Sequence, residues 1–279
     1  MQTLNIIGAG RLGQSLGRLF RDHQQYAIQN ILTRSAASAV QAREFIGQGE
    51  ALYHFAQLQP ADVNLIAVPD DQIAAVVADP YFQKSLTENA LVFHCSGSKS
   101  SALLNDLRGR GVSVASVHPI CSFADPAQVV LQFSGTLCTI EGDMAAKAKL
   151  LASFQALGAR LFEIDVDQKL LYHAASVFAS NYLVSLMDVA IAAFVGAGLE
   201  QALAIEMTRS LAEKTMHNAF ELGCAQALTG PIRRGDMQTV VQQQACVEVY
   251  DAVAGQLYQA FIAPTVALKI RAEKERLRP

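Results

Sequence analysis

A glycine-rich segment directly after the first apolar run constrains this chain most. Leu4–Ile7 is short and aliphatic, and the segment that follows it holds three glycines at the start of a helical pattern. In that context two glycines let the backbone turn tightly and approach a phosphate, and the third lets the helix pack on the strand. The free amides at the start of the helix attract phosphate oxygens. We therefore predict a dinucleotide site with contacts from Gly8, Gly10, Arg11, Leu12 and Gly13.

Runs rich in aliphatic and β-branched residues alternate with helical patterns across residues 1–165. This alternation predicts a mainly parallel sheet with helices on both faces. Together with the glycine segment, it indicates a Rossmann domain. The expected strands are Leu4–Ile7, Ile28–Thr33, Val63–Val68, Ala90–His94, Val112–Val117, Thr136–Glu141 and Ala159–Ile164.

The pattern changes after Asp165. Apolar residues then recur at helical spacing in long segments, broken at Gly196–Gly198, Gly223, Thr229–Pro231 and Ala263–Pro264. We predict an α/β Rossmann domain at residues 1–165 followed by an all-α domain at residues 166–279.

Composition narrows the function classes. The chain has 279 residues, 51% of them hydrophobic, which favours a large core or a buried subunit interface. The net charge of −3 and the lack of a basic patch with aromatic partners argue against nucleic acid as a ligand. The five cysteines are scattered, so we expect neither a disulfide framework nor a metal site. These features predict a protein of the reducing cytoplasm.

We expect no membrane partner. The first residues lack the basic and apolar regions of a signal peptide. The apolar stretch from Leu170 to Leu199 is interrupted by polar residues, including His173, Asn181 and Asp188. That interruption predicts a buried helix instead of a membrane span.

The end of the second strand favours NADP over NAD. An NAD site would place an acid there against the ribose hydroxyls, but this chain has Arg34 and Ser35. Arg34 can bind a 2′-phosphate through charge-assisted hydrogen bonds, and Ser35 can donate another. The alternative is that Arg34 is an ordinary solvated arginine. At a neighbouring strand end, Val68 and Pro69 are expected to flank the cofactor, and Asp70 to cap the next helix.

Two further strand ends carry polar residues where Rossmann ligands bind. His94 and Ser96 follow one strand, and His118 precedes a proline at the end of another. We expect His94 and Ser96 to contact substrate and His118 to be catalytic, although a histidine in such a place is often structural. Cys95 could be a nucleophile, but hydride transfer needs none.

The first long helix after residue 165 carries a narrow polar stripe of Lys169, His173, Ser176 and Ser180. Such a stripe should face a cleft or polar groups of another element, because burying it without partners is unfavourable. We expect Lys169 and His173 to be catalytic and Ser180, with Asn181 at the edge, to bind substrate. Alternatively, the serines bond to the preceding turn of their own helix.

A loop bounded by glycine and proline carries Arg233 and Arg234. This pair could bind an anionic group of the substrate or close the nucleotide site, and spacing alone does not choose between them.

The whole chain resembles the Rossmann-like proteins whose C-terminal half is the domain of unknown function 2520. This family is similar to prephenate dehydrogenase, pyrroline-5-carboxylate reductase, ketopantoate reductase and 6-phosphogluconate dehydrogenase. The resemblance rests on Gly8–Gly13, Val68–Asp71, His94–Gly97, His118–Pro119 with Ser122–Phe123, Tyr172–Ala175 through Ser180–Asn181, Thr229–Pro231, and Arg233–Asp236.

The resemblance implies roles for several residues. It maps the catalytic histidine of prephenate dehydrogenase-like enzymes onto His118, and the lysine of the Lys-x-x-x-Asn pair of ketopantoate reductase-like enzymes onto Lys169. His173 stands where that asparagine would be, which departs from the pattern. The resemblance also implies a homodimer formed through the helical domain.

The leading hypothesis is an NADP-dependent oxidoreductase of a small carbonyl or imine compound. The substrate would lie between the two domains, and His118, Lys169 or His173 would supply the proton. The alternative is an NADP-binding regulatory or structural protein without turnover. A methyltransferase is disfavoured, because Arg34 stands where an acid would usually hold the ribose.

Overall fold

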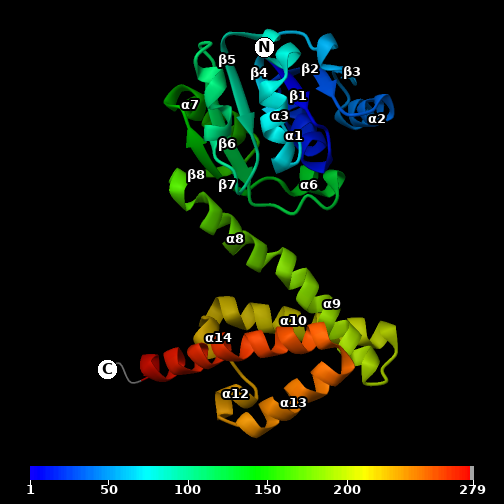
Figure 1. Cartoon of the computed structure of the whole chain (residues 1–279), viewed down its shortest axis with the longest axis vertical. Coiled ribbons are helices and arrows are strands. Elements are labelled where there is room, and N and C mark those ends of the chain that lie inside the picture. The colour runs from blue at the N-terminus through cyan, green and yellow to red at the C-terminus, as the bar shows by residue number, and fades with distance from the viewer. Residues whose placement is uncertain (277–279) are drawn as a thin grey trace. The chain divides into compact units, whose positions relative to one another are not determined.

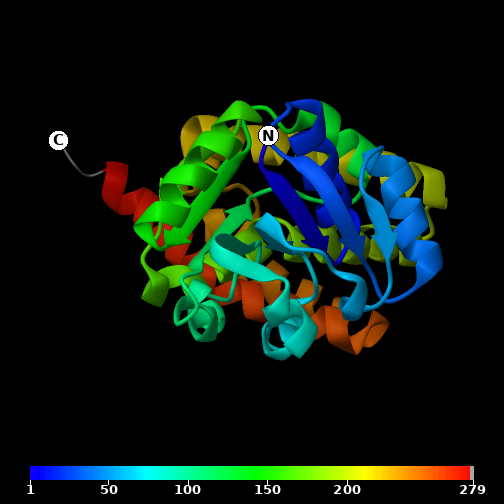
Figure 2. The same ribbon diagram turned by 90° about the horizontal axis from the view of Figure 1, so that it is seen from above.

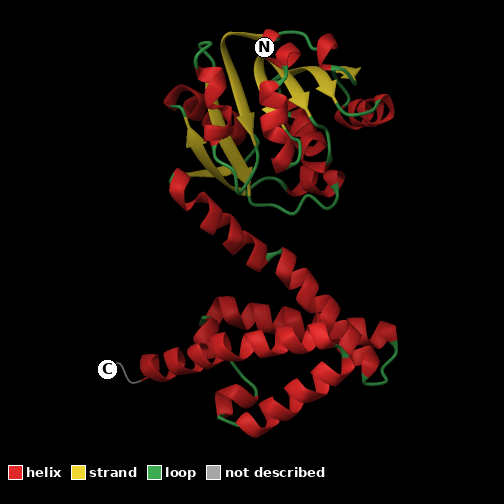
Figure 3. Ribbon diagram, in the orientation of Figure 1, coloured by secondary structure: helices red, strands yellow, loops and turns green. Residues whose placement is uncertain are grey.

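The computed structural model describes residues 1–276. The chain forms two compact units, Met1–Ser180 and the residues from Asn181 onward. Within the described residues the strands all lie in the first unit, whereas the second consists of helices and loops (Figures 1 and 3). The predicted fold class, an α/β Rossmann domain followed by an all-α domain, is confirmed.

One sheet of eight strands forms the first unit, in the order β3-β2-β1-β4-β5-β6-β7-β8. Neighbouring strands from β3 to β6 pair in parallel, β7 runs antiparallel to β6, and β8 runs parallel to β7. The chain order reverses between β1 and β4, and ligands of such sheets bind beyond the carboxyl ends of the strands at that reversal. The strands are β1 (Thr3–Ile7), β2 (Ala27–Leu32), β3 (Glu50–Leu52), β4 (Ala61–Ile66), β5 (Leu86–His94), β6 (Ser113–Pro119), β7 (Leu137–Gly142) and β8 (Arg160–Glu163).

Side chains from both faces of the central strands are buried, which explains their nearly continuous apolar sequences. Alternate residues of β1, β4, β5 and β6 enter two separate hydrophobic clusters, and helices lie on both sides of the sheet (Figure 2). In the first cluster Phe20 packs edge-on against Phe154 with ring centroids 5.5 Å apart. Burying a side chain of this size contributes about 1.5–3 kcal/mol.

The helices of the first unit divide between the two clusters. The first cluster includes residues of α1 (Arg11–Asp22), α2 (Ala36–Ile46), α6 (Pro126–Gln132) and α7 (Met144–Ala156). The second includes residues of α3 (Ile73–Ala78), α4 (Pro80–Lys84), the 3-10 turn η3 (Ser101–Leu104) and α5 (Asn105–Arg108). The remaining short turns are η1 (Phe55–Gln57), η2 (Asp70–Gln72) and η4 (Val166–Gln168).

Local sequence fixes where several of these helices begin. Asp79 accepts hydrogen bonds from two backbone amides of the following turn and Asp125 from one, and a proline stands at the first helical position after each. Their carboxylates satisfy amides that have no partner inside the helix, and proline has no amide to satisfy.

The second unit consists of helices broken largely where the sequence predicts. α9 ends at Gly196, α10 ends just before Gly223, and α12 begins at Pro231. The break expected at Ala263–Pro264 is wrong, because Pro264 lies inside α14. The hydroxyl of Thr265 donates to the carbonyl of Phe261 in the turn that the proline interrupts. The helices are α9 (Asn181–Gly196), α10 (Gln201–Leu222), α11 (Cys224–Ala227), α12 (Pro231–Arg234), α13 (Met237–Tyr250) and α14 (Ala252–Arg276).

The apolar segment expected as a buried helix is mostly exposed in the single chain, so that prediction is wrong. It forms α8 (Lys169–Ala179) and α9, and Leu170 and Val184 are each 70% exposed. By length and composition, Val166–Gly196 could cross a membrane, and none of its most apolar window is buried. α9 packs against α10 and α13, and much of the apolar surface of the segment remains exposed in the single chain.

Candidate active site

The glycine segment between β1 and α1 has a distinct steric role at each glycine. Gly8 has a φ of +88°, and a Cβ there would lie 2.7 Å from the carbonyl oxygen of Ala67. A Cβ at Gly13 would overlap the carbonyl oxygen of Gly8, whereas nothing lies within 4 Å of the Cβ position at Gly10. The first two contacts require glycine for the turn and for helix packing. Gly10 leaves an open approach to the backbone.

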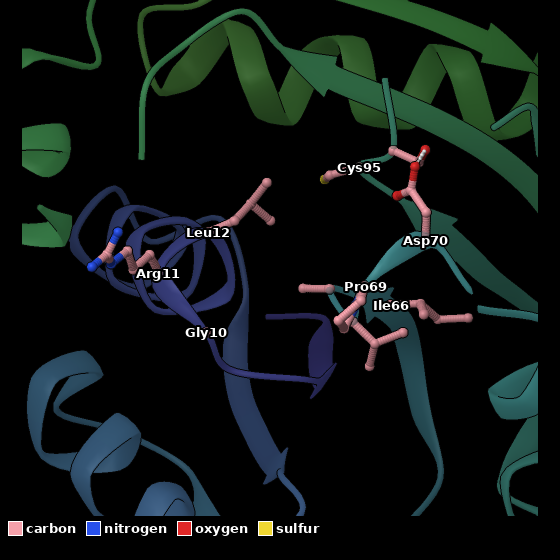
Figure 4. Close-up of a pocket in the computed structure, with 10 residues that line it drawn as sticks. Gly10, Arg11, Leu12, Ile66, Pro69, Asp70 and Cys95 are labelled. Carbon is pink, nitrogen blue, oxygen red and sulfur yellow. Dashed lines mark hydrogen bonds between the residues drawn. The ribbon is translucent and has the colours of Figure 1, made fainter. Parts of the chain in front are cut away.

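A pocket opens beside this turn at the carboxyl ends of β1, β4 and β5 (Figure 4). Among the described residues no side chain caps the start of α1, so its first amides remain available to a ligand. The pocket contains Arg11, Leu12, Val68 and Pro69, which the sequence predicts as cofactor contacts. Its lining is Gly10, Arg11, Leu12, Ile66, Ala67, Val68, Pro69, Asp70, Cys95 and Ser96.

Arg34 and Ser35 lie outside this pocket, beyond the end of β2 on the other side of β1. Arg34 is exposed. Ser35 caps α2 by accepting a hydrogen bond from the amide of Ser38 at 3.2 Å, and its hydroxyl donates to the Ser38 hydroxyl at 2.9 Å. Arg34 is thus available to an anion, while the Ser35 hydroxyl already serves the helix.

His94 organises the loop that follows β5. Its Nδ1 accepts a hydrogen bond from the Ser96 amide at 3.2 Å, so Nε2 carries the proton and donates to the Ser100 carbonyl at 3.1 Å. The ring is fully buried, and burial, followed by the charge of Lys169, lowers the pKa of His94 to about 4. This corrects the expectation that His94 contacts substrate, because both nitrogens are used inside its own loop.

Asp70 joins this loop to the turn after β4. Its carboxylate accepts hydrogen bonds from the hydroxyls of Ser96 and Ser98 at 2.7 and 2.8 Å. The expected capping role is wrong, because η2 begins at Asp70 and has no side-chain cap. Ser96 and Asp70 both line the pocket, with the Asp70 carboxylate directed toward the loop that carries Cys95 (Figure 4). Burial raises the pKa of the Cys95 thiol, which removes Cys95 as a nucleophile.

Three aromatic side chains meet at the end of β6. Nδ1 of His118 lies 2.8 Å from the Tyr172 hydroxyl, and the His118 and His173 rings pack edge to face with centroids 5.5 Å apart. Gly97 lies against both imidazoles, since a Cβ there would overlap His173 Nδ1 and come within 2.8 Å of His118 Nε2. In residues 1–276 the buried Nδ1 of His173 has no hydrogen-bond partner. Burial, then the charges of His173 and Lys169, lowers the pKa of His118 to about 4.

Lys169 forms a buried ion pair in the first unit. Its side chain is 2% exposed, and its ammonium donates to the Glu141 carboxylate at 3.1 Å and to the Ser116 hydroxyl. Glu141 also accepts hydrogen bonds from the amide and hydroxyl of Ser101 at 2.8 and 2.6 Å. Burial lowers the pKa of Lys169, and Glu141 opposes that change.

The position of Lys169 corrects two expectations. We expected a second-domain lysine open to substrate, but the compact units divide after Ser180 and not after residue 165. The ion pair ties the start of α8 to the sheet, because Glu141 lies on β7 and Ser116 on β6.

The other predicted residues are not assembled into this site. The hydroxyls of Ser176 and Ser180 donate to backbone carbonyls one turn earlier, at 3.3 and 2.7 Å, as in the alternative interpretation of the stripe. Asn181 begins α9 in the second unit. Arg233 and Arg234 also lie in the second unit, where α12 holds the first half-buried and the second exposed.

Two protein-family models match consecutive parts of the chain. Residues 2–119 match a Rossmann-like domain, and residues 136–264 match a domain of unknown function, DUF2520. The chain is a Rossmann-like protein with a DUF2520 domain. The Rossmann-like domain carries the glycine turn and His118. The DUF2520 domain begins before β7 and supplies Glu141, Lys169 and Tyr172.

Solved structures share this fold along nearly the whole chain. A Bacteroides fragilis protein provisionally named an NADP oxidoreductase is 21% identical, with a TM-score of 0.80 over 95% of this chain and 98% of that one. A Thermotoga maritima protein whose name states no activity is 27% identical, with a TM-score of 0.71 over 98% and 99% of the two chains. An imine reductase from Myxococcus stipitatus in complex with NADP+ is 17% identical, with a TM-score of 0.63 over 95% and 94%. A search of curated proteins gave no significant match.

Sequence reasoning assigned no site role to Gly97, Glu141 or Tyr172, although the family resemblance included Gly97 and Tyr172, and it missed Asp70 as a loop anchor. Glu141 had a usable signal, since an acid at the end of an apolar strand requires a partner when buried. Tyr172 stood next to a predicted stripe but outside it, and no spacing rule connects it with His118.

Proposed function

We propose that this protein is an NADP-dependent oxidoreductase that transfers a hydride between the cofactor and a small carbonyl or imine compound. The observation that supports this most directly is the pocket beside the glycine turn, with His118 at the end of a neighbouring strand of the same sheet edge. The family and fold support the same reaction class.

The first unit fits a dinucleotide. A pyrophosphate needs backbone amides and close approach, and Gly10 at the start of α1 offers both. Arg34 stands exposed beyond β2, the strand end that holds the adenosine ribose in Rossmann domains, and supports NADP over NAD. A similar solved structure, the imine reductase, contains NADP+.

Calorimetry tests the cofactor. Wild-type protein should bind NADPH more tightly than NADH, and Arg34→Ala should remove most of that preference because the 2′-phosphate loses a cation. Arg43→Ala is the matched control, since Arg43 is another exposed arginine, in the last turn of α2. An unchanged preference in Arg34→Ala would remove Arg34 from the site, and no heat with either nucleotide would refute the proposed function.

We assign substrate polarisation to His118. When bound, NADPH supplies the hydride, and the oxygen or nitrogen of the substrate must then receive a hydrogen bond or a proton. Burial raises the pKa of Tyr172, which keeps its hydroxyl protonated. If that hydroxyl donates to Nδ1 of His118, the imidazole is neutral with its proton on Nε2, where it can donate to substrate. His173 packs against His118 and restrains the ring.

We assign Lys169 a supporting role. Its ammonium is already bonded to Glu141 and Ser116 and has almost no exposed surface, so it does not contact substrate directly. Its charge acts on the neighbouring side chains and helps lower the pKa of His118.

Turnover separates an enzyme from an NADP-binding regulatory protein. NADPH oxidation should be measured with a panel of 2-oxo acids and cyclic imines. An active substrate should lose turnover in His118→Asn while the Kd of NADPH stays unchanged. Tight NADPH binding without consumption across the panel favours the regulatory alternative, and full activity in His118→Asn removes this residue from the mechanism.

We further propose that a second copy of the chain covers the helical unit, giving a homodimer. Among the described residues of this unit the buried side chains are mostly small, such as Ala204, Thr208 and Ala254. Large apolar side chains remain outside, with Phe220 87% and Val249 91% exposed. Exposed apolar surface on this scale marks an interaction site. The start of the apolar α8–α9 segment is fixed to the sheet through Lys169, which favours a protein partner over a bilayer.

Light scattering without detergent tests this assembly. Wild-type protein should have twice the mass of the 30.0 kDa chain. Val249→Glu should shift it toward the monomer, whereas Leu131→Glu, at an exposed residue of the first unit, should not. A monomeric wild type would refute the dimer.

The cysteines are all free in the structure, which supports the proposed cytoplasmic location.

A further inference from the structure

The pocket beside the glycine turn has opposite charges at its two ends. The start of α1 forms one end, with the exposed Arg11 side chain extending away from the opening, and Asp70 lies across the opening beside the loop after β5 (Figure 4). The first end suits phosphates, because the amides at the start of a helix favour anions. A carboxylate at the other end favours a ligand part that carries positive charge.

The carboxylate of Asp70 is held in place. Its oxygen Oδ2 accepts both serine hydroxyls, Ser96 at 2.7 Å and Ser98 at 2.8 Å. The Ser96 hydroxyl oxygen in turn accepts the backbone amides of Ser98 and Lys99. No ion pair neutralises Asp70 within residues 1–276. Its charge is thus fixed in direction, and the nearby Lys169 ammonium is already paired with Glu141.

Strand order places Asp70 beside the nicotinamide half of a bound dinucleotide. The two mononucleotide halves of a Rossmann domain bind on opposite sides of the reversal between β1 and β4. Arg34 lies on the β2 side, which is the adenosine half, and Asp70 follows β4 on the other side. The nicotinamide ring is a cation when oxidised and neutral when reduced.

We propose that Asp70 gives this pocket a preference for the oxidised nicotinamide, binding NADP+ more tightly relative to NADPH than a pocket without that carboxylate would. The proposal rests on the proposed function, because it requires the cofactor to occupy this pocket. Asp70 is a specificity-determining residue here and takes no part in proton transfer. The neighbouring imidazole of His118 is neutral above its lowered pKa of about 4 and does not offset the carboxylate.

Calorimetry with NADP+ and NADPH measures this preference as the ratio Kd(NADPH)/Kd(NADP+). Asp70→Asn keeps the shape of the side chain and an oxygen that can accept the serine hydroxyls, but removes the charge. We expect the ratio to fall about threefold to tenfold. This is the attraction between two unit charges, here the carboxylate and the oxidised ring, that lie roughly 6 Å apart in partly hydrated surroundings. Asp71→Asn is the matched control, because Asp71 is the exposed neighbouring acid, and it should leave the ratio unchanged.

A second measurement uses the wild type alone. Salt weakens phosphate binding equally for both cofactor forms, so the ratio isolates the attraction of Asp70 for the ring. That ratio should fall as ionic strength rises.

The outcomes separate this inference from the proposed function. An unchanged ratio in a folded Asp70→Asn variant overturns the inference, and so does weaker binding of both forms by the same factor, which would mean that Asp70 only supports the loop. If Asp70→Asn does not fold, a wild-type ratio that is insensitive to salt overturns it instead. Failure of the wild type to bind either form refutes the proposed function, and the inference with it.

Discussion

Acid should loosen the carboxyl edge of the sheet through one buried histidine. Neutral His94 accepts the Ser96 amide on Nδ1 and donates to the Ser100 carbonyl from Nε2. A proton added to Nδ1 would bring two hydrogen-bond donors, this N–H and the amide of Ser96, face to face in the protein interior. The native state therefore resists protonation, and burial lowers the pKa of His94 from 6.5 to about 4.

The direction of the effect on stability follows from this lowered pKa. Between pH 6.5 and pH 4 the unfolded chain binds the proton and the native chain does not, so the free energy of unfolding decreases as pH falls. The contribution of neutral His94 is fully present above the unfolded pKa and is lost as pH falls through the folded pKa. Between pH 7 and pH 5 these two pKa values give a loss of about 2 kcal/mol.

Urea unfolding at pH 7 and pH 5 tests this value. His94→Gln keeps an acceptor and a donor but does not titrate, so its unfolding free energy should fall by about 2 kcal/mol less than that of the wild type between these pH values. His23→Gln removes an exposed histidine and should behave like the wild type. If His94→Gln loses as much stability as the wild type over this range, the native pKa of His94 is not lowered and the reasoning fails.

Three further changes test other contacts. Lys169→Met should destabilise the first unit by about 3–5 kcal/mol in urea unfolding, because it leaves the Glu141 carboxylate buried without its cation. The double variant Lys169→Met with Glu141→Leu should recover part of that loss, and a double variant that is no more stable than Lys169→Met would contradict this account. Gly97→Ala should lower turnover and leave the Kd of NADPH unchanged, because the added Cβ displaces the His118 and His173 rings. Unchanged turnover would show that catalysis does not depend on the positions of these rings. Tyr172→Phe should decrease kcat about tenfold, equivalent to about 1.4 kcal/mol, and change the pH profile of kcat, because Nδ1 of His118 loses its partner. A variant with the wild-type kcat and pH profile would exclude the proposed hydrogen-bond role of Tyr172.

The fold was largely predictable because its strongest determinants are local. Apolar runs at the central strands and the glycine turn each produce a pattern within a few residues, and the structure contains both the strands and the tight turn. β3 escaped prediction because Glu50–Leu52 is too short to form such a run. The helix end predicted at Pro264 was wrong because proline usually ends a helix, whereas α14 continues through it and packs against α13.

The candidate site was less predictable because its contacts join distant segments. Lys169 was noticed for its polarity, but the partner that determines its role, Glu141, lies on another strand. His118 was chosen from its position after a strand, and Tyr172 was missed, although the two are 2.8 Å apart in space. A polar residue in an apolar pattern shows that a partner must exist, but only the fold identifies it.

The buried charges determine what the carboxyl edge of the sheet can do. The pair of Lys169 and Glu141 is internally neutral, yet its lysine still helps keep His94 and His118 unprotonated by lying near both rings. Among the described residues that line the pocket, that leaves Asp70 as the carboxylate, and it has no ion-pair partner. The pocket is thus lined by a fixed anion, while the neutral imidazole of His118 lies at the end of the neighbouring strand β6. This arrangement supports the proposed polarisation of a substrate by a neutral imidazole beside a dinucleotide, because the Lys169 amine is buried and already bonded to Glu141 and Ser116.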